Sequence, residues 1–308
     1  MAAMPPHPDS FTPQGATAPT SVLQGATAPT SVLQGATAPT SVLQGAAAPA
    51  PALQGAAAPA PVLQASGVTA GYGGRTVLQH LDLQVQRAEI YALLGSNGAG
   101  KTSTLSLFLG FLAPSAGSVR VQGIDPVADP DGARRQLAYI PENVALYEHL
   151  SARENLSYLL DLAGQPEDAQ AIDQALLAAG LAAEAHGRRV GGFSKGMRQK
   201  VAIALALARK VPALLLDEPT SGLDPQATAE FNRLLALLRA QGVAILMVTH
   251  DLLGAADVAD RIGFIDAGRL VEEVAAGSIG GSNDDGRAGD RFDVRALHRR
   301  YAAQGAAA

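Results

Sequence analysis

Cysteine is absent from all 308 residues of this chain. The chain can therefore form no disulfide bond and no thiolate metal site, which is typical of proteins from a reducing compartment. Its longest apolar runs, such as 201–208 and 243–248, are far shorter than the roughly 18 residues that a membrane-spanning helix needs. The first residues also lack the basic and apolar regions of a secretory signal. These absences predict a soluble, cytoplasmic chain.

Charged residues are few, and the net charge is slightly negative. The net charge is −5, from 23 basic and 28 acidic residues, so nothing favours a nucleic acid or an anionic lipid surface as the main partner. Hydrophobic residues make up 47% of the chain, which is enough for a real core within one or two domains.

The segment 14–64 is a ten-residue repeat in which Gln-Gly-Ala-Thr-Ala-Pro-Thr-Ser-Val-Leu occurs three times and then twice in degraded form. No charged residue occurs between Asp9 and Arg75, and the prolines prevent a long helix. The composition predicts that residues 1–64 are disordered. The Val-Leu pairs suggest weak docking points. We favour the alternative that the repeat is translated tandem-repeat DNA, upstream of the true start.

The remaining sequence alternates between strand and helix patterns. Partly alternating apolar residues predict antiparallel strands early in this region, and later apolar strands separated by helices predict a mostly parallel sheet covered on both faces. The predicted strands are 67–72, 76–78, 81–85, 89–94, 118–121, 137–140, 214–217 and 243–249, with a hairpin over 262–274; the predicted helical segments are 104–112, 152–185, 201–209, 231–240 and 293–303.

These patterns predict an α/β fold with an N-terminal antiparallel subdomain and an inserted helical subdomain. We place the folded domain at 65–275 and its helical subdomain at about 143–205. Residues 276–308 are predicted to be a linker rich in Gly, Ser, Asn and Asp, followed by a short helix.

A phosphate-binding loop lies between the predicted strand 89–94 and the predicted helix 104–112. The stretch Gly95-Ser96-Asn97-Gly98-Ala99-Gly100-Lys101-Thr102-Ser103 satisfies G-x-x-x-x-G-K-[ST]. Glycines let the backbone turn tightly round an anion, and the following helix directs its positive end at the same phosphates. Lys101 is expected to reach the β- and γ-phosphates, and Thr102 to hold Mg²⁺. The motif predicts a P-loop NTPase fold that binds ATP or a similar nucleotide.

Two adjacent carboxylates follow a later apolar strand. Asp217 and Glu218 end the run Leu214-Leu215-Leu216, and ligands of such sheets bind at the carboxyl ends of the strands. Asp217 is expected to bind in the Mg²⁺ shell, and Glu218 to polarise the attacking water.

In addition to these two motifs, residues 65–275 resemble the ATP-binding cassette (ABC) family. The stretch Phe193-Ser194-Lys195-Gly196-Met197-Arg198-Gln199 is similar to the family's signature motif. Ser221-Gly222-Leu223-Asp224 is similar to its D-loop, and Val248-Thr249-His250-Asp251 to the segment that carries its switch histidine. Tyr72 occupies the place of the aromatic residue that stacks on adenine.

The resemblance implies a role for each matching residue. Gly98 to Thr102 and Lys101 would bind the phosphates of ATP, Thr102 and Asp217 would hold Mg²⁺, and His250 would contact the γ-phosphate. Ser194, Lys195, Gly196, Met197 and Asp224 would complete the site of a second copy, because the family sandwiches two nucleotides between two cassettes.

The sequence departs from the family pattern in three of its motifs. Ser96 replaces a common proline, and the signature has Lys195 and Met197 where the family has Gly and Gln. Glu142 stands in place of a glutamine in Ile140-Pro141-Glu142-Asn143. A carboxylate can approach Mg²⁺ or water but cannot donate a hydrogen bond as an amide does. We expect an active ATPase that uses Glu218, His250 and Glu142.

The resemblance leaves two classes of cassette open. A soluble cassette that acts on ribosomes or DNA usually has two cassettes or a long coiled coil, whereas only 93 residues separate Lys101 from Ser194. We therefore favour the ATPase of a transporter, attached through a separate membrane permease to the cytoplasmic face of a bacterial inner membrane. The segment after Glu142 would contact the permease. The sequence is most similar to ATPases of ABC-2-type exporters and of the copper-related maturation system for nitrous-oxide reductase.

Overall fold

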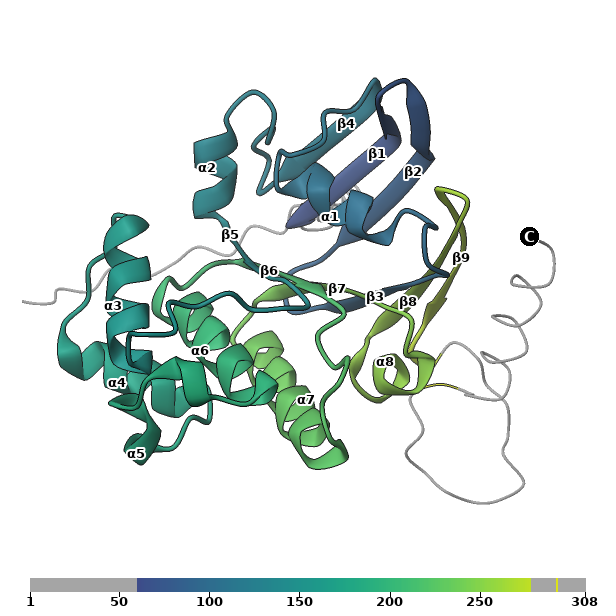
Figure 1. The fold of residues 1–308 in the computed structure, drawn as a ribbon. Helices are drawn as coiled ribbons and strands as arrows, with labels where there is room; N and C mark the ends of the chain where they lie inside the picture. The colour runs from purple at the N-terminus through teal and green to yellow at the C-terminus, as the bar shows by residue number, and fades with distance from the viewer. Residues whose placement is uncertain (1–59, 278–291, 293–308) are drawn as a thin grey trace, which may run out of the picture. The chain divides into compact units, whose positions relative to one another are not determined.

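The computed structural model describes residues 60–277 and 292 (Figure 1). Most of the repeat segment and the predicted helix 293–303 lie outside the described residues. The first strand begins at Leu63, two residues before the predicted start of the folded domain, because Leu63 pairs with both Val85 and Val121.

A six-stranded sheet forms the centre of the fold, in the order β5-β6-β7-β3-β8-β9. All neighbouring strands are parallel except β8 and β9, which form an antiparallel hairpin. The predictions of a mostly parallel sheet and of a hairpin within 262–274 are therefore confirmed. The strands are β3 (Ile90–Leu94), β5 (Leu137–Ile140), β6 (Ala213–Asp217), β7 (Ala244–Thr249), β8 (Arg261–Asp266) and β9 (Arg269–Ala275).

Both faces of this sheet are buried. Along β3, Ile90, Ala92 and Leu94 belong to one apolar cluster, and Tyr91 and Leu93 belong to another on the opposite face. Side chains of a strand alternate between its faces, so a strand with two covered faces reads as the continuous apolar run seen in the sequence.

The predicted N-terminal antiparallel sheet is confirmed, and it covers one face together with α1. It has three strands in the order β2-β1-β4 and contributes Leu63, Leu81 and Val119 to the second cluster. Its strands are β1 (Leu63–Tyr72), β2 (Arg75–Val85) and β4 (Ala116–Val121), and the helix is α1 (Lys101–Phe108).

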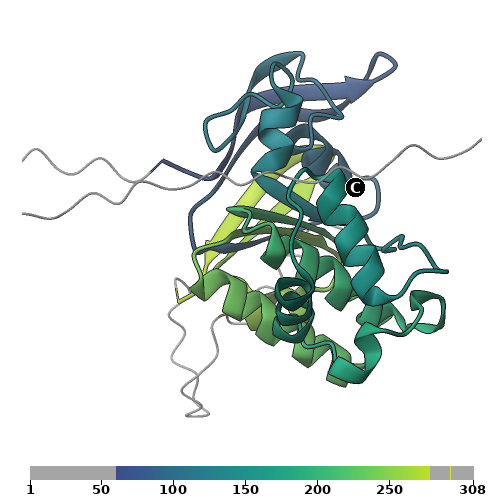
Figure 2. The same cartoon turned by 90° about the vertical axis from the view of Figure 1, so that its left-hand side faces the viewer.

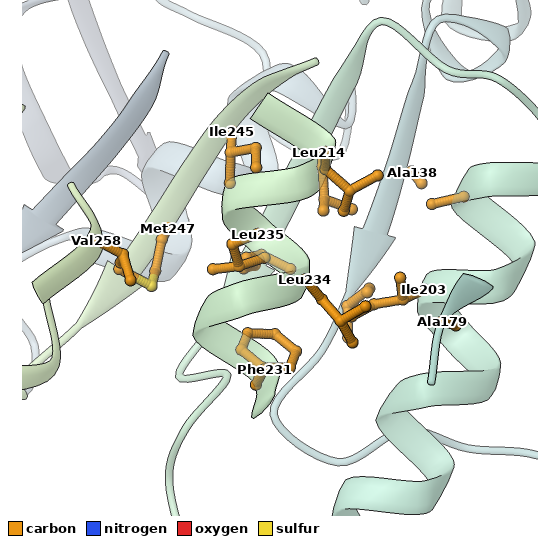
Figure 3. Close-up of a cluster of buried hydrophobic side chains, with 14 of the residues drawn as sticks. Ala138, Ala179, Ile203, Leu214, Phe231, Leu234, Leu235, Ile245, Met247 and Val258 are labelled. Atoms are coloured by element: carbon orange, nitrogen blue, oxygen red, sulfur yellow. The ribbon is translucent and has the colours of Figure 1, made fainter. Parts of the chain in front are cut away.

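Helices cover the other face (Figures 1 and 2). Figure 3 shows Phe231, Leu234 and Leu235 of α7 among Leu214 of β6, Ile245 of β7 and Ile203 of α6. The helices on this face are α3 (Ala152–Leu162), α4 (Ala169–Ala178), α5 (Ala183–His186), α6 (Lys195–Ala208), α7 (Pro225–Ala240) and α8 (Leu252–Val258). The helix α2 (Pro130–Arg135) lies on the side of the antiparallel sheet, where its Ala133 belongs to the second cluster (Figure 1).

Several helix bounds differ from those predicted. The helix predicted at 104–112 spans 101–108, the one at 201–209 spans 195–208, and the one at 231–240 begins at 225. The helical segment predicted at 152–185 is three helices, α3, α4 and α5. Within the described residues, none of the helices has the length and apolar character required to cross a bilayer.

Asp173 of α4 connects the three helices α3, α4 and α5. Its carboxylate accepts two hydrogen bonds of 2.9 Å from Arg153 of α3, and it lies 3.0 Å from Nδ1 of His186 at the end of α5. His186 is only 2% exposed. The hydrogen bonds from Arg153, followed by those from His186, lower the pKa of the Asp173 carboxyl.

We expect Asp173→Ala to lower the free energy of unfolding by about 1–3 kcal/mol, because it leaves the buried His186 ring without its carboxylate partner. A carboxyl with a lowered folded pKa stabilises the fold fully above its unfolded pKa of about 3.9, and this stabilisation is lost as pH falls through the lower folded value. Thermal unfolding at pH 7 should show the loss. Asp161→Ala, at an exposed position of α3, is the control; equal melting temperatures for the two variants would contradict the assigned role.

Candidate functional site

The predicted phosphate-binding loop connects β3 to α1 and is held in a tight turn. Gly98 and Gly100 have φ angles of +83° and +112°, values that residues with a Cβ rarely adopt. A Cβ on Gly95 would collide with the carbonyl oxygen of Ile265 in β8. Gly100 is the N-cap of α1. The first N–H groups of a helix have no partner within it, so those of Lys101 and Thr102 are available to an anion.

The β8–β9 turn contacts this loop through a backbone hydrogen bond. Gly268 donates its N–H to the carbonyl of Ala99 (2.9 Å) and accepts from the N–H of Gln79 (2.8 Å). A Cβ on Gly268 would collide with the carbonyl oxygen of Val77. Only a glycine at this position therefore allows the hairpin to approach β2 so closely.

Lys101 lies over the loop with only 7% of its surface exposed. Its Nζ donates to the carbonyl oxygens of Gly95 (2.8 Å) and Ser96 (3.3 Å) and lies 3.6 Å from Oε1 of Glu218. The cation is thus held where the loop and the end of β6 meet.

Asp217 ends β6 and contacts two other segments. Its side chain is hydrogen-bonded to that of Thr102, and Tyr139 of β5 donates its hydroxyl to Oδ2 at 3.4 Å. Burial raises the pKa of the Asp217 carboxyl, an effect that the Thr102 hydrogen bond opposes and the Glu218 charge reinforces. Burial and the Asp217 charge raise the pKa of Tyr139 to about 12, so its hydroxyl stays protonated and can donate.

Glu218 adopts a φ of +45°, an uncommon conformation for a residue with a side chain. Its N–H donates to the carbonyl of Val248 (2.9 Å), and its Oε2 accepts from the hydroxyl of Thr249 (3.1 Å) and the N–H of His250 (3.2 Å). Nδ1 of His250 lies 2.8 Å from the same oxygen. Backbone strain of this kind often accompanies a functional site.

Glu142 lies in the segment that follows β5. Its Oε1 accepts a hydrogen bond from the hydroxyl of Ser221 (3.2 Å) and lies 3.9 Å from Nζ of Lys195. The carboxylate therefore contacts the turn after β6 and the start of α6.

The signature stretch forms the start of α6. Ser194 is the N-cap, and its hydroxyl accepts from the N–H of Met197 (3.3 Å). A Cβ on Gly196 would lie in ordinary contact with Leu223 and Ala227, at 3.6 and 3.7 Å. Gln199, fully buried, donates its amide to the carbonyl of Pro219.

The structure therefore brings only some of the predicted residues together. Lys101, Thr102, Asp217, Glu218 and His250 form one contiguous group. No hydrogen bond or ion pair within residues 60–277 joins this group to Tyr72, which ends β1 half exposed, or to Asp224, which caps α7 through the N–H of Ala227 (2.8 Å).

Four residues that contact the site have no role predicted from the sequence, which are Tyr139, Thr249, Ser221 and Gln199. The last three lie within the motifs that resemble the family. A contact by Thr249 can be predicted from the sequence, because it precedes His250 at the end of a predicted strand. No sequence pattern places Tyr139 beside Asp217, since that depends on which strands are neighbours.

A phosphate-binding loop after β3, beside two carboxylates at the carboxyl end of β6 in the same parallel sheet, defines a P-loop nucleotide-binding site. The sequence profile of the ABC transporter family matches residues 78–221. A solved structure of an ATP-binding subunit of an ABC transporter is 32% identical and superposes with a TM-score of 0.63, covering 70% of this chain and 90% of that chain.

Three curated relatives agree with this match. The bacitracin transport ATP-binding protein BcrA of Bacillus licheniformis is 36% identical over 208 residues, 67% of each chain. The doxorubicin resistance ATP-binding protein DrrA of Mycobacterium tuberculosis is 36% identical and covers 73% of this chain and 66% of its own. The methionine import ATP-binding protein MetN of Caulobacter vibrioides is 36% identical, with 68% and 65% covered.

The chain belongs to the ABC transporter family, and it is an ATP-binding and ATP-hydrolysing subunit of such a transporter. The expected family, fold class and activity are thereby confirmed.

Proposed function

We propose that this chain drives an ABC-2-type exporter by binding ATP at the phosphate-binding loop and hydrolysing it with Glu218. The observation that carries the proposal is the contact of Lys101 and His250 with that one carboxylate. The names of BcrA and DrrA, for bacitracin transport and doxorubicin resistance, favour export of a small molecule or peptide. They do not favour the copper-related maturation system.

ATP would bind with its phosphates on the loop 95–103. The unpartnered N–H groups at the start of α1 and the Lys101 ammonium would contact the phosphate oxygens. To do so, Nζ would exchange its hydrogen bonds with the Gly95 and Ser96 carbonyls for phosphate. Tyr72, half exposed at the end of β1, would stack on the adenine.

The residues present fit Mg²⁺, which prefers hard oxygen ligands such as carboxylates and hydroxyls. The Thr102 hydroxyl and the Asp217 carboxylate are already in contact, and Glu142 is the third candidate. Bound Mg²⁺ would neutralise phosphate charge during hydrolysis. Tyr139, by donating to Oδ2 of Asp217, would fix the direction in which that carboxylate points.

Glu218 would act as the general base. Its Oε2 is held by the hydroxyl of Thr249 and the backbone N–H of His250, which leaves Oε1, on the Lys101 side, to accept a proton from the attacking water. His250, with 61% of its side chain exposed, would turn from Glu218 towards the γ-phosphate.

A second copy of the chain would complete each nucleotide site. Ser194 is the N-cap of the 14-residue helix α6, and a helix start with a serine hydroxyl suits a terminal phosphate. Lys195, Gly196 and Met197 would lie at the same contact, and Asp224 beside it. Two chains would therefore pair around two ATP molecules. Nucleic acid is not part of this proposal.

The permease would bind near the segment after Glu142, which holds the chain at the cytoplasmic face of the bacterial inner membrane. Tyr147 and Tyr158 are 43% and 45% exposed, and their rings pack edge to face with centroids 5.0 Å apart. Leu162, on the same helix as Tyr158, is 73% exposed. Aromatic residues of this kind are enriched in protein interfaces.

We expect the chain to co-purify with the ABC-2-type membrane protein encoded beside it, and Tyr147→Ala/Tyr158→Ala to abolish this association. Detergent extraction of co-expressed proteins followed by affinity purification and mass spectrometry measures both. Leu237→Ala, at a 58% exposed position of α7, is the control and should leave association intact. A chain that never co-purifies with any membrane protein would refute the transport role.

A further inference from the structure

Glu142 and Lys195 form a bridge between two segments that carry different parts of the proposed site. Lys195 is the first residue of α6, and its Nζ lies 3.9 Å from Oε1 of Glu142. Ser221 donates to the same oxygen at 3.2 Å. The N–H of Ser221 in turn donates to the carbonyl of Glu218 (3.2 Å). The bridge is therefore connected to the turn after β6, which carries Glu218, the proposed general base.

The two residues are both departures from the family pattern, and they compensate each other. Glutamine at 142 would carry no charge, and glycine at 195 would offer no cation. Here a carboxylate and an ammonium of opposite charge occupy these positions in contact. Lys195 therefore offsets the negative charge of Glu142, and the family pattern has neither of these two charges.

That charge has a consequence at the nucleotide site. Asp217 and Glu218 already place two carboxylates there, and the Glu142 charge adds to burial and to Glu218 in raising the pKa of Asp217. ATP brings further negative charge. An uncompensated carboxylate at 142 would thus oppose nucleotide binding by Coulomb repulsion.

We propose that Lys195 is a positioning residue for the nucleotide site of its own chain, which holds Glu142 against Ser221 and offsets its charge. This inference rests on the proposed function. It assigns Lys195 a role within one chain, in addition to any contact with the nucleotide of a second copy. Because the lysine and glutamate side chains are 28% and 47% exposed, the expected effect is at most about fivefold.

The two roles of Lys195 can be separated by measuring binding in single chains. We would measure the Kd of trinitrophenyl-ATP by fluorescence in the absence of Mg²⁺, so that Glu142 acts only through its charge, at a protein concentration where sedimentation shows no pairing. Lys195→Ala should raise this Kd about two- to fivefold. In a Glu142→Gln background the same substitution should change it little, because no charge remains to be offset. Lys195→Arg should bind as the wild type does.

Lys200→Ala is the matched control, since Lys200 lies on the same helix but pairs with Glu230 at 2.8 Å. Its effect should be equal in both backgrounds. An equal effect of Lys195→Ala in both backgrounds, or no effect in either, would overturn the inference. Lys101→Ala distinguishes this from failure of the proposed site, because that variant should lose binding whatever Lys195 does.

Discussion

Glu218→Gln should lower ATP hydrolysis by about 10²–10⁴-fold, the usual contribution of a general base, while ATP stays bound. The amide keeps the size of the side chain but cannot take a proton from water. It also removes a negative charge 3.6 Å from Lys101, so the affinity for ATP should hold or rise. Phosphate release measures the first effect, and retention of radiolabelled ATP on the purified chain measures the second.

Glu230→Gln is the control for this experiment. Glu230 lies on α7 and pairs with Lys200, outside the group around Lys101, so its loss should change hydrolysis by less than about twofold, as is usual for a surface ion pair. Hydrolysis by Glu218→Gln at near the wild-type rate would show that another group activates the water.

Lys101→Ala should abolish tight ATP binding. The ammonium is expected to make two charged hydrogen bonds to phosphate, each worth about 1.5–3 kcal/mol, so the Kd should rise by about 10²–10⁴-fold. The substitution also leaves Glu218 without its cation, which adds repulsion of the phosphates. Equilibrium titration with a fluorescent ATP analogue measures the change.

Thermal unfolding should accompany the Lys101→Ala titration, because the side chain is 7% exposed and its loss leaves a cavity. A variant that melts as a single cooperative transition and still fails to bind supports the role of Lys101. Binding by a folded Lys101→Ala chain within about threefold of the wild type would contradict the charged hydrogen bonds assumed above.

The sequence predicted those parts of the site that depend on neighbouring residues in the chain. The strand, loop and helix around Gly95 to Ser103 are local, as is the hairpin with Ala267 and Gly268, whose φ angles of +43° and +80° fit a tight turn. Asp217 at a strand end follows from the apolar run before it. Each of these needs no knowledge of the tertiary structure.

Helix bounds follow the capping residues more closely than the apolar residues, so the apolar pattern predicts them less well. The helix after the loop begins at Lys101, directly after Gly100, and ends before Gly110, whose φ is +71°. Leu112 is buried but lies beyond the helix. The start of α7 is marked by Asp224 and Pro225, an N-cap followed by proline at the first helical position, whereas the apolar pattern begins only at Phe231.

Contacts between distant segments could not be predicted. Tyr139 reaches Asp217 because β5 and β6 are neighbours in register, with Tyr139 beside Leu215. Ser221 reaches Glu142 across 79 positions of sequence. Such contacts depend on strand order and on how α6 packs, and the pattern of a single sequence carries neither.

The buried amide of Gln199 has a mechanical consequence. The helix α6 is capped by Ser194, and about one turn later its Gln199 donates a hydrogen bond to the carbonyl of Pro219, next to Glu218. If Ser194 contacts the nucleotide of a second chain, a movement of Ser194 on binding would be transmitted along α6 to the turn that positions Glu218 at its own nucleotide. ATP binding at one site of the pair should therefore affect the other site, and the hydrolysis rate should rise more steeply than linearly with ATP concentration.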